Sequence, residues 1–180
     1  MDKETSLYDM YQFIGKEVPS FKYHELSKFI NNPDEFFDLI KENGIVLILY
    51  GTVSPNVGHW TSIILTKDNN GNDIYEFFDP YSGKYDSEKQ YISRKQLINN
   101  GEIIDYLTMI LKQADLPVSY NKYQYQKYSK GVATCGRWVI VRYIFHEFSS
   151  DEFEFFINMF AKAKKMSLDR WITLFTSRLS

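Results

Sequence analysis

Apolar and polar positions along the chain follow two kinds of pattern, short continuous apolar runs and stripes with helical spacing. Three continuous runs lie close together in the sequence and predict strands of one sheet: residues 45–50, 60–66 and 74–78. The first run is bounded by Gly44 and Gly51, which is typical of a buried strand. The segment 67–73 between the other two contains an Asn-Gly step and predicts a hairpin, so these two strands should be antiparallel.

Helical spacing of apolar positions predicts helices on both sides of these strands, at residues 5–17, 33–43, 93–114, 136–148, 151–165 and 168–178. Pro33 is a good first-turn residue, and Gly44 is a good residue just past a helix end. The stripe within 93–114 consists of Ile103, Ile104, Leu107, Ile110 and Leu111. Residues 118–126 alternate as in a strand. The pattern predicts an α+β fold with a small antiparallel-centred sheet flanked by helices, in a single domain covering residues 1–180.

Charge is nearly balanced over the whole chain but unevenly placed along it. The formal net charge is −2 over 180 residues, which argues against a chain that mainly coats nucleic acid. Residues 1–120 hold 11 basic and 18 acidic side chains, whereas residues 121–180 hold 10 basic and 5 acidic. Solvated helix faces account for this split, and a DNA contact through the basic last third is the functional alternative. Four tyrosines near its start suit base stacking or, as we favour, one face of a strand: Tyr120, Tyr123, Tyr125 and Tyr128.

The ends and the apolar runs carry no targeting signal. The N-terminal residues lack the apolar stretch of a secretory signal, and the longest apolar run is far shorter than the roughly 20 residues that span a bilayer. No lipidation motif is present. We therefore expect a soluble protein in a reducing compartment, without a membrane partner.

Cys135 is the single cysteine, so the chain can form neither an internal disulfide nor a thiolate zinc site. It lies between a predicted loop and a predicted buried helix, where the helix N-terminus favours a thiolate. Gly136 beside it lets a substrate backbone approach closely. Two roles fit Cys135 at this position: a small residue that caps a core helix, or a nucleophile.

A nucleophilic thiol needs a base, and His59 is the best placed of the three histidines. His146 lies too far along the same predicted helix as Cys135, and His24 lies in a predicted surface stretch. His59 begins a predicted strand, while Asp79 ends the next one and is held extended by Pro80. Because adjacent antiparallel strands bring one start near the other end, His59 and Asp79 should be neighbours.

Metal and cofactor chemistry lacks a motif in the sequence. Neither His24-Glu25 nor His146-Glu147 has a second histidine four residues on, and no glycine-rich phosphate loop is present. We expect no metal and no cofactor.

Taken together, His59-Trp60, Phe78-Asp79-Pro80 and Thr134-Cys135-Gly136 resemble the adenain/ubiquitin-like-protease clan of cysteine peptidases. The order His, Asp, Cys is the clan's order, and the resemblance covers residues 45–148. Together with the small size, the segment from Thr134 to Trp138 looks most like the maturation proteases of virophages and large DNA viruses.

This resemblance implies a thiol protease with a His59-Asp79-Cys135 triad and an oxyanion hole. In this family, the side-chain amide of a glutamine before the cysteine helps to bind the oxyanion. Two glutamines match it here at a longer spacing than is usual: Gln126, nine residues before Cys135, and Gln124, eleven before. We choose Gln126, with the backbone N–H of Cys135 as the other donor. Trp60 is expected to pack beneath the site. The implied substrates are viral capsid or scaffold precursors, cleaved in the virion or in the virus factory of the infected cell. A protease of ubiquitin-like modifiers and an inactive binding module of the same fold are the alternatives.

Overall fold

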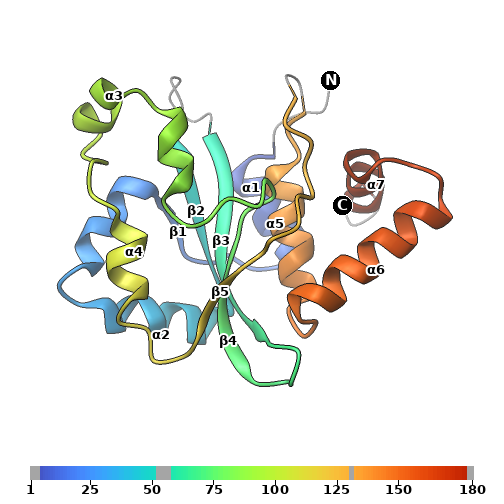
Figure 1. The fold of residues 1–180 in the computed structure, drawn as a ribbon, viewed down its shortest axis with the longest axis horizontal. Helices are drawn as coiled ribbons and strands as arrows, with labels where there is room; N and C mark the ends of the chain where they lie inside the picture. Colours follow the sequence, from blue (N-terminus) through green and yellow to red (C-terminus); the bar gives the residue numbers. More distant parts are fainter. Residues whose placement is uncertain (1–4, 52–57, 130–131, 178–180) are drawn as a thin grey trace.

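The computed structural model describes residues 5–51, 58–129 and 132–177 of the chain (Figure 1). In this part the elements are, in chain order, α1 (Leu7–Ile14), β1 (Ser20–Lys22), the 3₁₀ helix η1 (Tyr23–Phe29), α2 (Pro33–Asn43), β2 (Ile45–Gly51), β3 (Gly58–Lys67), β4 (Asp73–Phe78), the 3₁₀ helix η2 (Ser87–Tyr91), α3 (Arg94–Asn99), α4 (Tyr106–Leu111), β5 (Val118–Tyr120), α5 (Cys135–Ile144), α6 (Ser150–Ala163) and α7 (Leu168–Thr176). The predicted α+β class is confirmed.

The described strands form one mixed sheet in the order β1-β2-β3-β4-β5. The central pairs β2–β3 and β3–β4 are antiparallel, as predicted, but both edge strands run parallel to their neighbours. The sheet is therefore mixed rather than purely antiparallel. Helices connect β1 to β2 and β4 to β5, which is the usual way to join parallel strands.

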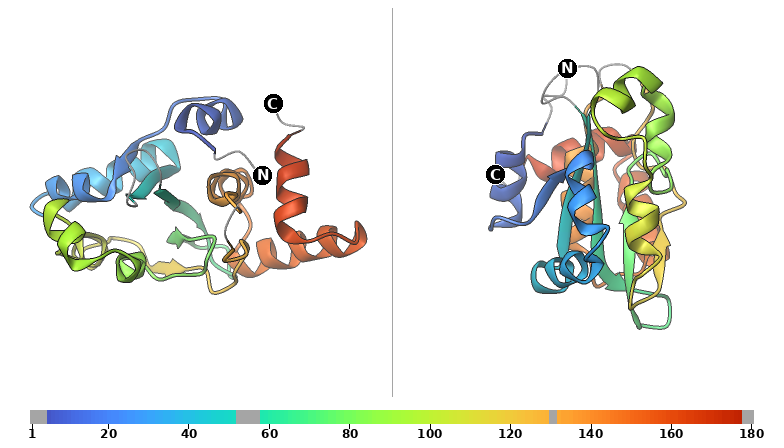
Figure 2. Two further views of the ribbon diagram at one scale, coloured as in Figure 1. Left: turned by 90° about the horizontal axis from the view of Figure 1, so that it is seen from above. Right: turned by 90° about the vertical axis from the view of Figure 1, so that its left-hand side faces the viewer.

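Helices cover both faces of the sheet and bury a separate apolar cluster on each (Figures 1 and 2). One cluster joins β2, β3 and β4 to α1, α5, α6 and α7. The other joins the opposite face to η1, α2 and α4. Ile45 and Leu47 of β2 point to the first cluster, whereas Val46 and Ile48 point to the second. This burial on both faces explains why β2 reads as a continuous apolar run rather than an alternating one.

The single helix predicted over 93–114 is wrong. The chain forms α3 and α4 instead, and Gly101 between them takes a left-handed conformation with φ of 72°. Ile103 and Ile104, which extended the apolar stripe, are 58% and 49% exposed, whereas Leu107 packs in the core. Periodicity alone did not reveal the break because the two isoleucines happen to fit the helical spacing.

Other parts of the fold also differ from the prediction. The strand predicted over 118–126 is limited to β5, so the tyrosines do not share one strand face: Tyr125 is buried and Tyr128 is 62% exposed. The helix that begins at Cys135 ends at Ile144, so His146 lies beyond it. The short elements β1 and η1 were not predicted at all. The last predicted helix extends to a residue outside the described part of the chain.

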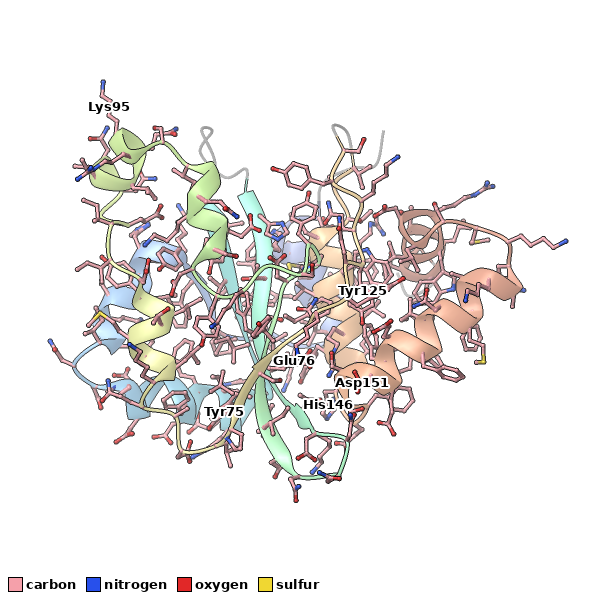
Figure 3. All side chains as sticks on the ribbon, in the orientation of Figure 1. Tyr75, Glu76, Lys95, Tyr125, His146 and Asp151 are labelled. Carbon is pink, nitrogen blue, oxygen red and sulfur yellow. The ribbon has the colours of Figure 1, made fainter. Side chains whose placement is uncertain are left out.

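A buried ion pair joins the sheet to α5. Glu76 on β4 accepts hydrogen bonds from Arg142 Nε and Nη2 at 2.9 and 3.3 Å, and both side chains are fully buried. Arg142 also donates to the carbonyl oxygens of Phe145 and Phe148 where the helix ends. Figure 3 shows Glu76 and its neighbour Tyr75 on opposite sides of β4. One residue of the basic last third therefore belongs to the core, not to a surface patch.

Candidate functional site

The β3–β4 hairpin brings His59 and Asp79 together. Ser62 lies opposite Phe78 in this hairpin, so the same register continued would place His59 opposite Tyr81 and diagonal to Asp79. His59 Nε2 lies 2.6 Å from Asp79 Oδ1, and both side chains are buried. The predicted neighbourhood of this pair is confirmed, because it depends only on local strand register.

The carboxylate of Asp79 is held by the turn that follows it. The backbone N–H of Tyr81 donates to Oδ1, and the N–H of Gly83 donates to Oδ2, each at 2.9 Å. A Cβ atom at Gly83 would lie only 2.3 Å from Asp79 Oδ2, so a residue with a side chain would not fit in this backbone position. The turn therefore fixes the carboxylate in the orientation in which it meets His59.

Asn121 positions the Asp79 backbone and was missed by sequence reasoning. Its amide oxygen accepts from the Asp79 N–H and its amide nitrogen donates to the Asp79 carbonyl, both at 2.8 Å. Asn121 follows β5 directly and is fully buried. No signal in the sequence indicated this contact, because it depends on the parallel pairing of β5 with β4.

Cys135 opens α5 and is partly exposed. Its side chain lies near the imidazole of His59, close enough to raise the pKa of that ring. Because Nε2 of that ring faces Asp79, the remaining nitrogen, Nδ1, is the one available to the sulfur. The residue before it, Thr134, donates to Asp169 Oδ1 of α7 at 2.7 Å, which anchors the start of the helix. The three predicted residues therefore lie near one another, and Asp79 and His59 are in direct hydrogen-bond contact.

The surroundings of His59 favour its protonated form. Burial lowers the pKa of His59. Hydrogen bonding with Asp79 and Cys135 and the negative charges of these groups raise the pKa by more than burial lowers it, to about 10. A carboxylate on one ring nitrogen and a sulfur on the other thus stabilise an imidazolium.

Tyr81 stacks on His59 and was also missed. The two ring centroids are 4.5 Å apart and the planes differ by 19°. Tyr81 is two residues after Asp79, so the hairpin register could have indicated that it lies on the same face.

Gln126 lies beside Tyr81 and is buried. Its amide nitrogen donates to the Tyr81 hydroxyl at 3.1 Å and to the Val132 carbonyl at 3.0 Å, while its amide oxygen has no partner among the described residues. Gln124, the other glutamine considered, is exposed and donates to the Gln126 carbonyl. The choice of Gln126 as an oxyanion donor stays a prediction, and both of its N–H groups are engaged in this structure.

The two supporting residues have distinct surroundings. Trp60 is half-buried and packs against the cluster that contains α5. A Cβ atom at Gly136 would lie 2.9 Å from the side chain of Thr5, so the absence of a side chain there lets the N-terminal segment pack against α5. The predicted role of Gly136 in admitting substrate stays a prediction.

Glu88 of η2 is a further buried carboxyl group beside the pair, and it was not predicted. Ligand atoms of Glu88, His59 and Asp79 lie within 4.8 Å of one another, and they are the one such group of three among the described residues. These types could bind a divalent cation. However, His59 and Asp79 are joined by a direct hydrogen bond, and both Asp79 oxygens already accept backbone N–H groups. The arrangement is therefore better suited to hydrogen bonding than to metal binding.

Replacing Glu88 with glutamine is expected to change how stability depends on pH. Burial raises the pKa of Glu88 from 4.5 to about 7; the charge of His59 opposes this shift, and the charge and hydrogen bond of Asp79 add to it. Because the folded-state pKa is the higher one, the stabilisation is complete below pH 4.5 and is lost as pH rises through 7. Relative to the wild type, Glu88→Gln should gain on the order of 2 kcal/mol in unfolding free energy between pH 5 and 8.

Urea unfolding at both pH values measures this gain. Glu42→Gln is the matched control, because Glu42 is exposed at the surface. A constant difference between wild type and Glu88→Gln across this range would contradict the prediction.

Basic side chains of the last third gather near the α6–α7 turn, where four of them are exposed: Lys162, Lys164, Lys165 and Arg170. A DNA contact at this surface stays a prediction. Among the described residues, no helix is both long and apolar enough to cross a bilayer.

Comparison with known proteins identifies relatives but no family model that matches the chain. Among curated proteins, the chain is 24% identical over 171 residues to an uncharacterized protein of Sputnik virophage, covering 95% of this chain and 93% of the relative. Among solved structures, it resembles the central domain of an uncharacterized protein from Legionella pneumophila, with 17% identity and a TM-score of 0.42 over 99% of this chain and 100% of that chain.

Proposed function

We propose that the protein is a cysteine endopeptidase with Cys135 as nucleophile, His59 as base and Asp79 as the residue that orients the base. The observation that carries this proposal is the position of the His59 imidazole, which is hydrogen-bonded to Asp79 at 2.6 Å and lies near enough to Cys135 for that residue to raise the pKa of the ring. A nucleophile, a base and an orienting group in hydrogen-bond contact are the arrangement that covalent catalysis requires. The position of Cys135, a partly exposed residue at a helix N-terminus, supports the same role.

In this mechanism His59 receives the proton of the Cys135 thiol, and Asp79 stabilises the resulting imidazolium. The sulfur attacks a peptide carbonyl, and the tetrahedral intermediate expels the amine, which takes its proton from His59. Water then hydrolyses the thioester. The backbone N–H of Cys135 has no partner within the helix because it belongs to the first turn, so it is free to bind the oxyanion. The Gln126 side chain is the predicted second donor, although both of its N–H groups already donate within the site.

The proposed substrates are viral capsid or scaffold precursors, processed in the virus particle or the virus factory. The similarity to a virophage protein over nearly the whole chain supports a viral setting. Proteases of ubiquitin-like modifiers are the alternative class. Purified protein should be incubated in parallel with a capsid precursor and with a modifier fused to a reporter. Cleavage of the modifier alone would reverse the ranking.

A thiol-reactive peptide probe, such as a peptidyl acyloxymethyl ketone, tests whether Cys135 is an activated nucleophile. We expect the folded protein to react at least about tenfold faster than free cysteine at pH 7, because the imidazolium of His59 stabilises the thiolate of Cys135. The reaction is measured by mass spectrometry, with urea-unfolded protein as the control. A rate equal to that of free cysteine would favour an inactive binding module of the same fold.

A further inference from the structure

The hydroxyl group of Tyr81 is a polar group beside the triad that the mechanism so far leaves without a role. The phenol ring stacks on the imidazole of His59. Its hydroxyl oxygen accepts a hydrogen bond from Gln126 at 3.1 Å, and burial and then the charge of Cys135 raise the pKa of Tyr81. Tyr81 itself is partly exposed, as a group that contacts substrate must be.

Gln126 holds this hydroxyl in place. One of its N–H groups donates to the Tyr81 oxygen and the other to the Val132 carbonyl. A backbone carbonyl can only accept, so Val132 fixes which end of the amide carries the nitrogen. The backbone N–H of Gln126 also donates to the Pro80 carbonyl at 3.0 Å, directly before Tyr81. Two bonds therefore hold Gln126 against the Pro80-Tyr81 segment.

The division of hydrogen bonds decides which group is free to donate. Gln126 has two N–H groups, and both are engaged. The Tyr81 oxygen accepts one of them, which leaves its own proton to be donated. A hydroxyl that accepts one hydrogen bond is a stronger donor in the next.

Resting on the proposed peptidase function, we propose that Tyr81 donates its hydroxyl to the oxyanion formed when Cys135 attacks a carbonyl, and that Gln126 is the positioning residue that aims it. The carbon–sulfur bond forms as the carbonyl π pair moves to oxygen. His59 holds the thiol proton, and Tyr81 keeps its own proton while hydrogen-bonding to the oxygen. Collapse of the intermediate returns the electron pair to the carbonyl, and the departing amine takes the proton from His59.

The Tyr81→Phe variant tests this role, because it keeps the ring on His59 and removes only the hydroxyl. We expect kcat for a reporter peptide to fall about 100-fold with little change in KM, as for loss of one oxyanion donor. Binding of a peptide aldehyde, whose hemithioacetal oxygen occupies the same position, should weaken by a similar factor. The rate of Cys135 alkylation by iodoacetamide, which forms no oxyanion, should stay within about twofold.

Tyr128→Phe is the matched control, since Tyr128 is exposed and packs against Tyr81 with ring centroids 4.9 Å apart. Gln126→Leu should weaken aldehyde binding while sparing alkylation. Unchanged kcat and aldehyde affinity in Tyr81→Phe would overturn the inference but leave the peptidase proposal intact. Equal losses in aldehyde binding and alkylation would also overturn it, because Tyr81 would then act on the thiol. A wild-type protein that neither cleaves peptides nor binds the aldehyde would overturn both.

Discussion

The Cys135→Ala variant is expected to lose peptide cleavage altogether, a fall of about 10⁵-fold or more, because no other group in the site can form the thioester. The remaining His59–Asp79 pair would be a base without a nucleophile. Cleavage of the substrate on which the wild type is active is measured by the appearance of new peptide termini. Cys135→Ser, which keeps the shape of the side chain, should be almost as inactive, because a serine hydroxyl is much harder to deprotonate than a thiol.

Folding of these variants provides the control. Cys135 is partly exposed, so both substitutions should change the free energy of unfolding by less than about 1 kcal/mol. Since the chain contains one cysteine, iodoacetamide must inactivate the wild type through Cys135. Cleavage retained by a folded Cys135→Ala protein, free of contaminating protease, would refute the proposed chemistry.

The Arg142→Met variant is expected to lose about 3–5 kcal/mol of stability, because it leaves the carboxylate of Glu76 buried without a partner. The guanidinium also satisfies the carbonyl oxygens of Phe145 and Phe148, which would lose their donors. Urea unfolding followed by fluorescence measures the loss.

The double variant Glu76→Met/Arg142→Met separates these contributions. Removing both charges should restore a large part of the stability, since a buried ion pair contributes little beyond an apolar pair of similar volume. Lys67→Met is the surface control, because the Lys67–Asp73 pair is solvent-exposed and such pairs contribute about 0–1 kcal/mol. A loss below about 1 kcal/mol in Arg142→Met would show that Glu76 becomes solvated or protonated without cost.

Local patterns in the sequence were sufficient to predict the hairpin and the His59–Asp79 pair of the candidate site. The Asn-Gly turn and the apolar runs on either side of it set the β3–β4 register, which alone makes His59 and Asp79 neighbours. The loop before Cys135 and the apolar stretch after it indicated that a helix starts there. Such features depend on hydrogen bonds between residues close in sequence, whose geometry repeats from protein to protein.

Only the tertiary structure decided which distant groups complete the site. Cys135 lies near His59 because α5 packs against β3, and Asn121 reaches Asp79 because β5 pairs with β4 in parallel. Glu76 and Arg142, 66 residues apart, meet in the core without a sequence pattern that indicates the pair. These contacts result from many weak packing interactions summed over the fold, and no short segment encodes them. By itself the sequence determined an α+β chain with a candidate base, acid and thiol. The packing of α5 on the sheet determined that the thiol lies near the base.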